Sequence, residues 1–314
     1  MRLVPMLRRL FTASLCCLML LSSSVFAAPK IPENQQLLAS QSTMLVDLDT
    51  GKTLYSEAPD LVTPIASVSK LMTALVVLDA GLPLNERIRV DVSQSPIMQN
   101  VISRIRIGST LTRKEALALS LMASENRAAT TLAHHYPGGF TAFVAAMNAK
   151  AKALGMNNSH FEEPTGLSSH NVSTAADLIK LVLAVRKYPL IGKLSSAKNR
   201  SVTFHRPRYS LAFYNTNPLV NRKSWHIELT KTGYTDDAGH CLVMLTKMGH
   251  RHVAFVALDS YGKYTHIADA TRLKKWITTG KSSPVPDEAL AYKLKKRAEH
   301  EQLSAQQENL LAVP

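Results

Sequence analysis

Residues 64–81 read PIASVSKLMTALVVLDAG, in which two serine hydroxyls and one lysine amine stand at the first turn of an apolar helix. From Leu71 onward almost every side chain is apolar, which predicts a buried helix that stops at Gly81. Ser67 and Lys70 stand three positions apart at its start, so their side chains would meet on one face. Helix capping by Ser67 explains this pattern, and so does a serine nucleophile beside an amine base. The stretch alone favours capping, because serine is common at helix starts.

The first 27 residues have the features of a cleavable export signal. Three arginines precede an apolar run that ends in small residues, and we place the cleavage after Ala27. The run is short for a membrane span, so we expect no integral membrane segment after cleavage. The mature chain then keeps only Cys241, which leaves no pair for an internal disulfide. Its apolar surroundings predict a buried, inert thiol.

The charge of the chain does not indicate a nucleic-acid partner. The net charge is +14, and removal of the three leader arginines leaves +11. The basic residues are scattered and aromatic residues make up only 6% of the chain, so an anionic envelope surface or a carboxylate-bearing substrate fits better. The histidine pairs at 134–135, 250 and 252 lack metal-ligand spacing, so we expect no metal and no cofactor.

Strand patterns lie near both ends of the chain, and helical patterns lie between them. The strand runs fall at 44–48, 53–55, 224–231, 239–247 and 251–260. The main helical runs fall at 67–80, 112–123, 126–135, 141–154, 173–185 and 265–277. Thr112 with Glu115, and Thr174 with Asp177, have the spacing of a helix cap. This order predicts an antiparallel sheet built from both ends of the chain, with a helical lobe inserted.

Three polar motifs occur in a fixed order. They are Ser67-x-x-Lys70, then Ser124-x-Asn126 between two helical runs, then Lys231-Thr232-Gly233 at the end of an apolar strand. Each is weak alone, but together they resemble the active-site set of the penicillin-binding proteins and serine β-lactamases. Ser67 precedes Ser124 by 57 residues and Lys231 by 164, separations similar to those of the low-molecular-mass DD-peptidases. The combination reverses the opening preference and favours Ser67 as a nucleophile.

The chemistry explains these residue types. A serine hydroxyl needs a base to take its proton, and Lys70 can act as that base only when it is partly neutral. Desolvation lowers the pKa of a lysine, and a second cation such as Lys231 lowers it further. Gly233 lets the strand edge approach a substrate closely, because a Cβ there would obstruct it.

The resemblance also implies a role for each site residue. Lys70 would be the general base, Ser124 the proton relay, Asn126 the group that holds the substrate's peptide amide, Lys231 and Thr232 the carboxylate-binding pair, and the backbone N–H groups of Ser67 and Tyr234 the oxyanion hole.

The likeness extends from about Ser42 to Gly280, through segments such as SENRAATTLAHHYPGG and TKTGYTDDAGHCLV. These look like the penicillin-binding protein 7 type of D-alanyl-D-alanine endopeptidase. The resemblance implies an α+β fold in three layers, of the β-lactamase/DD-peptidase kind. Its mostly antiparallel five-stranded sheet is flanked by helices and carries a helical lobe at about 85–175.

The same resemblance implies a periplasmic enzyme that hydrolyses D-alanyl–diaminopimelate cross-links in peptidoglycan during cell wall remodelling. Peptidoglycan would be its substrate, β-lactam antibiotics its covalent inhibitors, and other murein hydrolases candidate partners. We expect a signal peptide at 1–27, a catalytic domain at 28–282 and a polar tail at 283–314, which we interpret as a solvated, partly helical extension.

Three alternatives stay open. A D-alanyl-D-alanine carboxypeptidase uses the same machinery, and only overall similarity favours the endopeptidase. A class A β-lactamase shares the motifs but needs a carboxylate that activates water. Glu162 and Glu163 are candidates for this carboxylate, but we interpret them as residues on the surface of a loop. A non-catalytic wall-binding protein would be expected to have lost Ser67 or Lys70, and covalent labelling by a β-lactam separates it from an enzyme.

Overall fold

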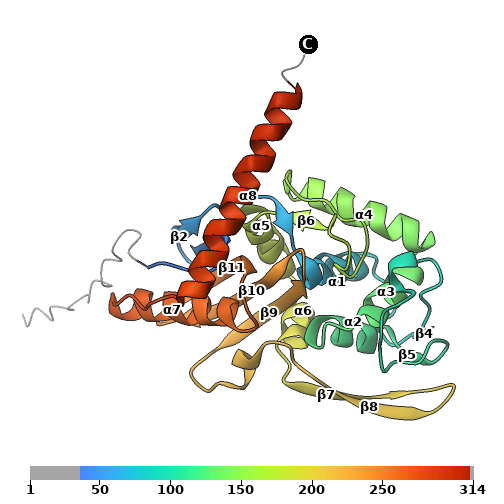
Figure 1. Cartoon of the computed structure of the whole chain (residues 1–314). Helices are drawn as coiled ribbons and strands as arrows, with labels where there is room; N and C mark the ends of the chain where they lie inside the picture. Colours follow the sequence, from blue (N-terminus) through green and yellow to red (C-terminus); the bar gives the residue numbers. More distant parts are fainter. Residues whose placement is uncertain (1–35, 312–314) are drawn as a thin grey trace, which may run out of the picture. The chain divides into compact units, whose positions relative to one another are not determined.

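Five antiparallel strands form the central sheet, in the order β2-β1-β11-β10-β9 (Figure 1). A computed structural model describes the backbone of residues 36–311 and the side chains of residues 36–302. The predicted export signal lies outside the described residues. The strands come from both ends of the chain, as predicted: β1 (Ser42–Asp47), β2 (Thr53–Glu57), β9 (Ile227–Thr235), β10 (Gly239–Met248) and β11 (Arg251–Ser260).

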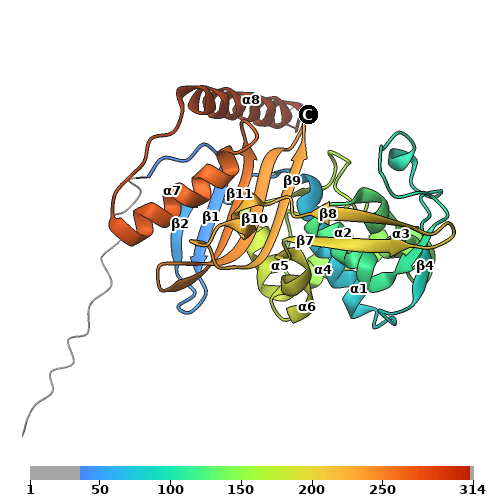
Figure 2. The ribbon, with the colours of Figure 1, turned by 90° about the horizontal axis from the view of Figure 1, so that it is seen from below.

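Helices cover both faces of this sheet, which gives the three layers that the sequence predicts. Successive side chains of a strand point to opposite faces. On β11, Phe255 therefore packs in a core with Trp276 of α7 (Thr265–Thr279), whereas Val256 packs in a second core with Leu181 of α5 (Ala175–Val185). Figure 2 shows α7 and α5 beside the strands.

The inserted lobe is helical apart from one short ribbon. The helix α1 (Lys70–Asp79) leads into the lobe, which contains α2 (Arg113–Met122), α3 (Asn126–His134), α4 (Gly139–Ala153) and the strands β4 (Arg87–Arg89) and β5 (Thr110–Thr112). The capping pair at the start of α2 is confirmed, because Thr112 Oγ1 accepts from the Glu115 N–H and the Glu115 carboxylate accepts from the Thr112 N–H. The helix α2 ends at Met122, two residues before Ser124.

Several short elements have no counterpart in the sequence prediction. They are β3 (Thr63–Pro64), β6 (Val172–Ser173), α6 (Pro189–Ser195), β7 (Asn199–Phe204), β8 (Tyr209–Tyr214) and the 3₁₀ turns η2 (Pro96–Met98) and η3 (Pro218–Asn221). The ribbon β7–β8 lies at the bottom of Figure 1. Pairing of β3 with β6 places the segment before Ser67 beside the segment that follows the helical lobe.

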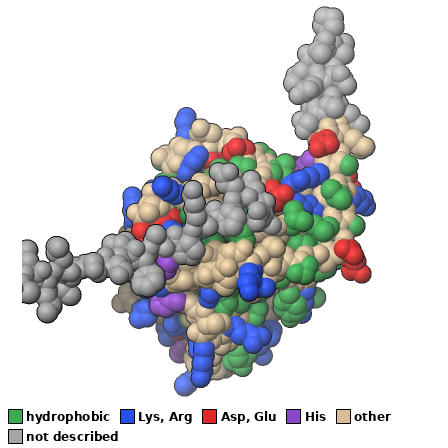
Figure 3. All heavy atoms as spheres, turned by 90° about the vertical axis from the view of Figure 1, so that its left-hand side faces the viewer, with side chains coloured by type: hydrophobic (Ala, Val, Ile, Leu, Met, Phe, Trp, Pro, Cys, Tyr) green, Lys and Arg blue, Asp and Glu red, His purple; other side chains and the backbone are tan. Residues whose placement is uncertain are grey.

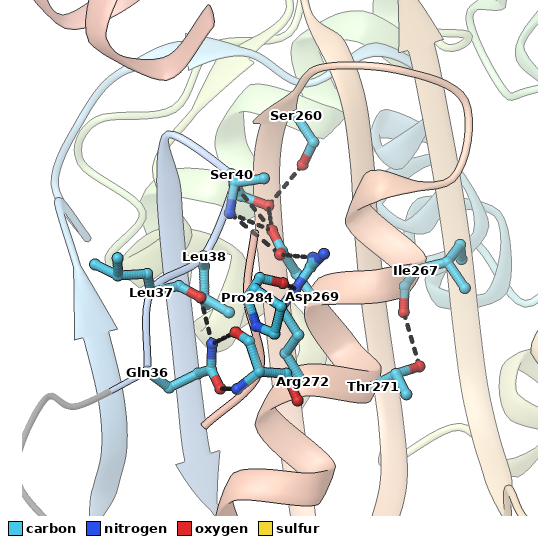
Figure 4. Close-up of polar contacts among 12 residues, drawn as sticks. Gln36, Leu37, Leu38, Ser40, Ser260, Ile267, Asp269, Thr271, Arg272 and Pro284 are labelled. Atoms are coloured by element: carbon cyan, nitrogen blue, oxygen red, sulfur yellow. Dashed lines mark hydrogen bonds and ion pairs between the residues drawn. The ribbon is translucent and has the colours of Figure 1, made fainter. Parts of the chain in front are cut away.

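A buried carboxylate fixes the start of the described chain to α7. Asp269 accepts hydrogen bonds from the Ala39 and Ser40 N–H groups, at 3.1 and 2.9 Å, and from the Ser40 hydroxyl at 2.6 Å. Arg272 pairs with the same carboxylate at 2.8 Å (Figure 4). The segment that leads into β1 is therefore tied to α7, the helix that covers one face of the sheet.

The helix α8 (Asp287–Leu311) packs against the sheet layer over its first turns. Lys293 is buried, and its Nζ donates to Leu38 O and pairs with Glu57, each at 2.8 Å. Arg297 pairs with the same Glu57 carboxylate at 2.5 Å. The sequence predicts a helical part here, but this docked portion is not the solvated extension that we expected, because its cations find a carboxylate on β2.

The remaining expectations concern the surface and the single cysteine. Among the described helices, none is both long and apolar enough to cross a membrane. On the face drawn in Figure 3, Lys and Arg side chains are spread among polar and apolar ones. Cys241 is buried, and burial raises the pKa of its thiol to about 12, so it is inert as predicted.

Candidate active site

Ser67 lies in a tight turn that places its side chain beside that of Lys70. The chain forms a 3₁₀ turn, η1 (Ala66–Ser69), directly before α1. In a 3₁₀ turn residues i and i+3 eclipse one another, more closely than on an α-helix. Lys70 Nζ lies 2.7 Å from Ser67 Oγ. Ala66 just before the serine has a left-handed φ of 44°, a conformation that non-glycine residues adopt mainly where the surroundings enforce it.

Lys70 is buried, and three oxygens surround its amine. Its Nζ lies within hydrogen-bond distance of Ser67 Oγ, Asn126 Oδ1 and the backbone oxygen of Thr165, each at 2.7 Å. A neutral amine has two N–H donors and one lone pair. Asn126 and Thr165 can take the two donors, which leaves the lone pair facing the Ser67 hydroxyl. The geometry therefore suits Lys70 as the acceptor of the serine proton.

The pKa of Lys70 lies at about 7 because burial disfavours the ammonium form. The negative charges of Glu163 and Glu125 act in the opposite direction and raise this pKa. Near neutral pH a substantial fraction of Lys70 is therefore uncharged and able to accept a proton.

A second serine–lysine pair faces the first. Ser124 lies at the junction of α2 and α3 with a left-handed φ of 58°. Its hydroxyl accepts a hydrogen bond from Lys231 Nζ at 2.9 Å, and the same Nζ donates to Thr232 O at 2.6 Å. Burial and the charge of Lys70 both lower the pKa of Lys231. The two amines are close enough to influence each other, as the sequence predicts.

The free edge of β9 closes the site. Thr232 Oγ1 donates to Thr216 Oγ1 at 2.6 Å, and Tyr234 is largely exposed beside it. A Cβ on Gly233 would lie 3.0 Å from Ala66 Cβ, Ile65 O and Ser67 N. Gly233 thus favours the close approach of β9 to the turn that carries the nucleophile, and its role in the approach of a substrate stays a prediction.

Glu163 is not on the loop surface, which corrects the prediction; Glu162 is exposed, as predicted. The Glu163 carboxylate turns inward and accepts from the N–H groups of Thr165 at 2.6 Å, Gly166 at 2.5 Å and Leu167 at 2.8 Å. These bonds satisfy backbone donors that no helix or strand would satisfy. The carboxylate thereby fixes the loop whose Thr165 carbonyl holds Lys70.

A cleft of about 350 Å³ opens above these residues. The predicted residues that line it are Ser67, Ser124, Asn126, Thr232, Gly233 and Tyr234. It also has walls that the sequence analysis missed, including Thr216, His240, Lys263, Tyr264 and His266. The His240 ring stacks on Tyr234 at 4.2 Å and on His266 at 5.1 Å. Strand alternation gave a signal for His240, because it must face away from the buried Cys241.

Within the part of the chain that the structure describes, no group of three His, Cys, Asp or Glu side chains could hold a metal ion. Burial lowers the pKa of His266 to about 3, so its ring is neutral.

An α+β fold with a serine, a buried lysine and a second serine–lysine pair at one cleft defines a serine acyl-transfer enzyme. The chain belongs to the Peptidase_S11 family, described as D-alanyl-D-alanine carboxypeptidase, whose profile matches residues 29–262. The fold and family predictions are confirmed by this match.

Two relatives share more than half of their aligned residues with this chain. A protein named D-alanyl-D-alanine endopeptidase from Escherichia coli (strain K12) is 57% identical over 296 residues, which are 92% of this chain and 96% of that protein. Another of the same name from Pseudomonas aeruginosa (strain PAO1) is 55% identical over 265 residues, 84% of this chain and 86% of that protein. The crystal structure of the Streptomyces K15 DD-transpeptidase is similar with a TM-score of 0.71 and 26% identity, covering 77% of this chain and 97% of that one.

Proposed function

We propose that this chain is a penicillin-sensitive serine D-alanyl-D-alanine endopeptidase. It hydrolyses D-alanyl–diaminopimelate cross-links in peptidoglycan through an acyl-enzyme on Ser67 and so acts in cell wall remodelling. The observation that carries the proposal is the 2.7 Å contact between Ser67 Oγ and a buried lysine whose pKa lies at about 7.

Acylation begins when Lys70 takes the Ser67 proton and Oγ attacks the D-alanyl carbonyl carbon. The carbonyl oxygen becomes negatively charged, and the N–H groups of Ser67 and Tyr234 stabilise it. One such donor is typically worth about 3 kcal/mol of the barrier. The approach of Gly233 to the Ser67 N–H supports this placement, because it brings the β9 edge beside the turn.

The leaving group carries an amine and a neighbouring carboxylate. The proton that Lys70 took from Ser67 passes through Ser124 to the departing amine, which leaves Lys70 neutral again. Lys231 and Thr232 bind the carboxylate, and Asn126 holds the amide of the acyl strand. The carboxylate favours the charged form of Lys231, and the charge on Lys231 in turn favours the neutral form of Lys70. Substrate binding therefore prepares the base. Water then attacks the acyl-enzyme and releases the product.

A class A β-lactamase is disfavoured by the surroundings of Glu163. Such an enzyme needs a carboxylate that activates the deacylating water. Here the Glu163 oxygens already accept from several loop donors, and Glu162 is exposed and accepts from Ser168. Neither carboxylate resembles a free base beside the nucleophile.

The endopeptidase is preferred to a carboxypeptidase because the relatives of 57% and 55% identity described above carry the endopeptidase name. The family description keeps the carboxypeptidase as the second candidate. The leader features of residues 1–27 support export to the periplasm, where peptidoglycan is the partner and other murein hydrolases are candidates for association.

The decisive experiment gives purified mature protein and its Ser67→Ala variant the same two substrates, a cross-linked dimeric muropeptide and a monomeric pentapeptide. We expect dimer cleavage that falls by at least about 10⁴-fold in the variant, because the nucleophile is lost. Labelling by a fluorescent penicillin should disappear in parallel. Release of D-alanine from the pentapeptide alone would indicate the carboxypeptidase, and equal cleavage by the variant would exclude the serine mechanism.

A further inference from the structure

The leaving group of the proposed reaction occupies one end of the cleft. Its carboxylate is held by Lys231 and Thr232, and Thr232 is hydrogen-bonded to Thr216. Pro218 follows two residues later and starts η3. Asn126, which we assign to the acyl strand, lines the cleft from the helical lobe, and Leu167 lines it from the loop that follows the lobe. We therefore place the departing strand toward Thr216 and Pro218.

A second hollow of about 620 Å³ continues from that end. The two cavities share Pro218, Tyr264 and Ile267 as lining residues, so the hollow lies directly beside the cleft. Beyond the shared wall, the hollow is lined by Trp225 and by Arg222, which is exposed. A ligand that enters at Ser67 and extends past Thr216 meets this hollow next.

The walls of the hollow combine an apolar surface with positive charge. Ile267 and Trp225 offer aliphatic and aromatic contact, and Lys274 Nζ lies 4.3 Å from the centroid of the Trp225 ring. Arg222 is the cation among the described residues that line the hollow, and none of these residues is acidic. Such a surface suits a methylene chain that carries a carboxylate-bearing peptide.

We propose that this hollow is the subsite for the departing strand of the cross-link, an aliphatic diamino-acid arm joined to an anionic peptide. The inference rests on the proposed function and adds the source of its substrate choice. A cross-linked strand continues beyond the bound carboxylate through a methylene arm, whereas the leaving D-alanine of a pentapeptide ends in a methyl group. Only the cross-link can use the hollow, so contacts there select endopeptidase over carboxypeptidase substrates.

The test compares Trp225→Ala and Arg222→Gln with Tyr214→Ala and Arg208→Gln as matched controls. The control residues are exposed, and they lie on β8 and in the turn that precedes it. For each variant, kcat/KM is measured for the dimeric muropeptide and for the pentapeptide, together with the rate of penicillin acylation and the melting temperature. We expect the two variants in the hollow to lose about tenfold in dimer cleavage, a loss of the size shown by the minority of contact residues that carry most of the binding energy. Pentapeptide cleavage and penicillin acylation should stay within about twofold, and the controls should be unchanged.

Two results would overturn the inference. An equal loss on dimer, pentapeptide and penicillin would mean that the hollow holds the acyl strand or merely supports the site. No loss on the dimer would mean that the departing strand lies elsewhere. Failure of the proposed function is a separate outcome, because the unmodified protein would then cleave no dimer at all.

Discussion

At the scale of single residues, the protonation of Lys70 is set by two opposing effects. Burial lowers its pKa to about 7, and the charge of Glu163 raises it from the lower value that burial alone would produce. Glu163 also holds the loop whose Thr165 carbonyl accepts from Lys70. One carboxylate thus acts on the base through its charge and through its hydrogen bonds, without a place in the reaction itself.

The variant Glu163→Gln tests this electrostatic role. Removal of the negative charge lowers the pKa of Lys70, and the base must be neutral to act. The acid limb of the kcat/KM profile, expected near pH 7 in the unmodified protein, should therefore move to lower pH. Penicillin acylation measured between about pH 5 and 9 covers this limb. A lysine with the ordinary pKa, near 10.4, would place the limb above that range.

The neighbouring variant Glu162→Gln is the matched control, because Glu162 is exposed. Its acid limb should stay in place. A uniform loss of rate in Glu163→Gln with an unmoved limb would show that Glu163 only supports the loop.

The motifs predicted Ser67, Lys70, Ser124, Asn126 and the Lys231-Thr232-Gly233 group, and these residues do meet at one cleft. The inward turn of Glu163 could not be predicted, because the local sequence does not reveal which backbone donors lack partners. Thr216, Tyr264 and His266 were missed for a similar reason. They reach the cleft only through the packing of η3 and α7 against the sheet.

At the scale of elements, the contact between β9 and η1 decides the geometry at Ser67. Gly233 allows the two backbones to approach, since even one methyl group there would meet Ile65 O and Ser67 N at 3.0 Å. The β7–β8 ribbon was unassigned from the sequence because most of its side chains are exposed or half-buried and form no clear apolar pattern. The strands β10 and β11 were predicted readily, because their apolar runs are long and buried. The strand β9 was predicted at 224–231 but spans Ile227–Thr235, so the Lys231-Thr232-Gly233 motif lies inside the strand and not at its end.

We predict that Gly233→Ala slows acylation while the protein stays folded. The added methyl group moves β9 away from η1 and displaces the oxyanion donor at Ser67. A displacement of this kind can reduce the rate by up to about 100-fold. The measurement is the second-order rate of penicillin acylation, with circular dichroism and the melting temperature as controls for folding. An unchanged acylation rate in a folded variant would contradict the prediction.

At the scale of the whole molecule, α8 is part of the folded unit over its first turns. Lys293 and Arg297 share the Glu57 carboxylate on β2, whose side chain is only 23% exposed. Desolvation lowers the pKa of Lys293, while Glu57 raises it and so stabilises the buried cation. The polar composition of this segment suggested a solvated tail, because sequence patterns do not show which cations will find a buried carboxylate.

The variant Glu57→Gln should lower the free energy of unfolding by about 1–2 kcal/mol, because it leaves two cations without their partner. Urea unfolding measures this change. The matched control is Glu299→Gln, which removes surface pairs with Lys295 and Lys296 at 3.8 and 3.6 Å. The Glu299 side chain is 44% exposed, so its loss should change stability by less than about 0.5 kcal/mol. Activity should be unchanged in both variants. Equal stability of the two variants would show that α8 contributes nothing through Glu57.

The sheet joins the two ends of the described chain, since Ser42 of β1 pairs with Leu258 of β11. Ser67 and Lys70 belong to the first third of the sequence, whereas Lys231 arrives only with β9. A chain that is still being synthesised therefore lacks one of its two amines, and its central sheet lacks three of five strands, until the last part of the sequence has emerged. Folding of this topology must await long-range strand pairing, which is slow because long loops have to close. The site that holds both amines can therefore assemble only after the segments that form β9 to β11 have been synthesised.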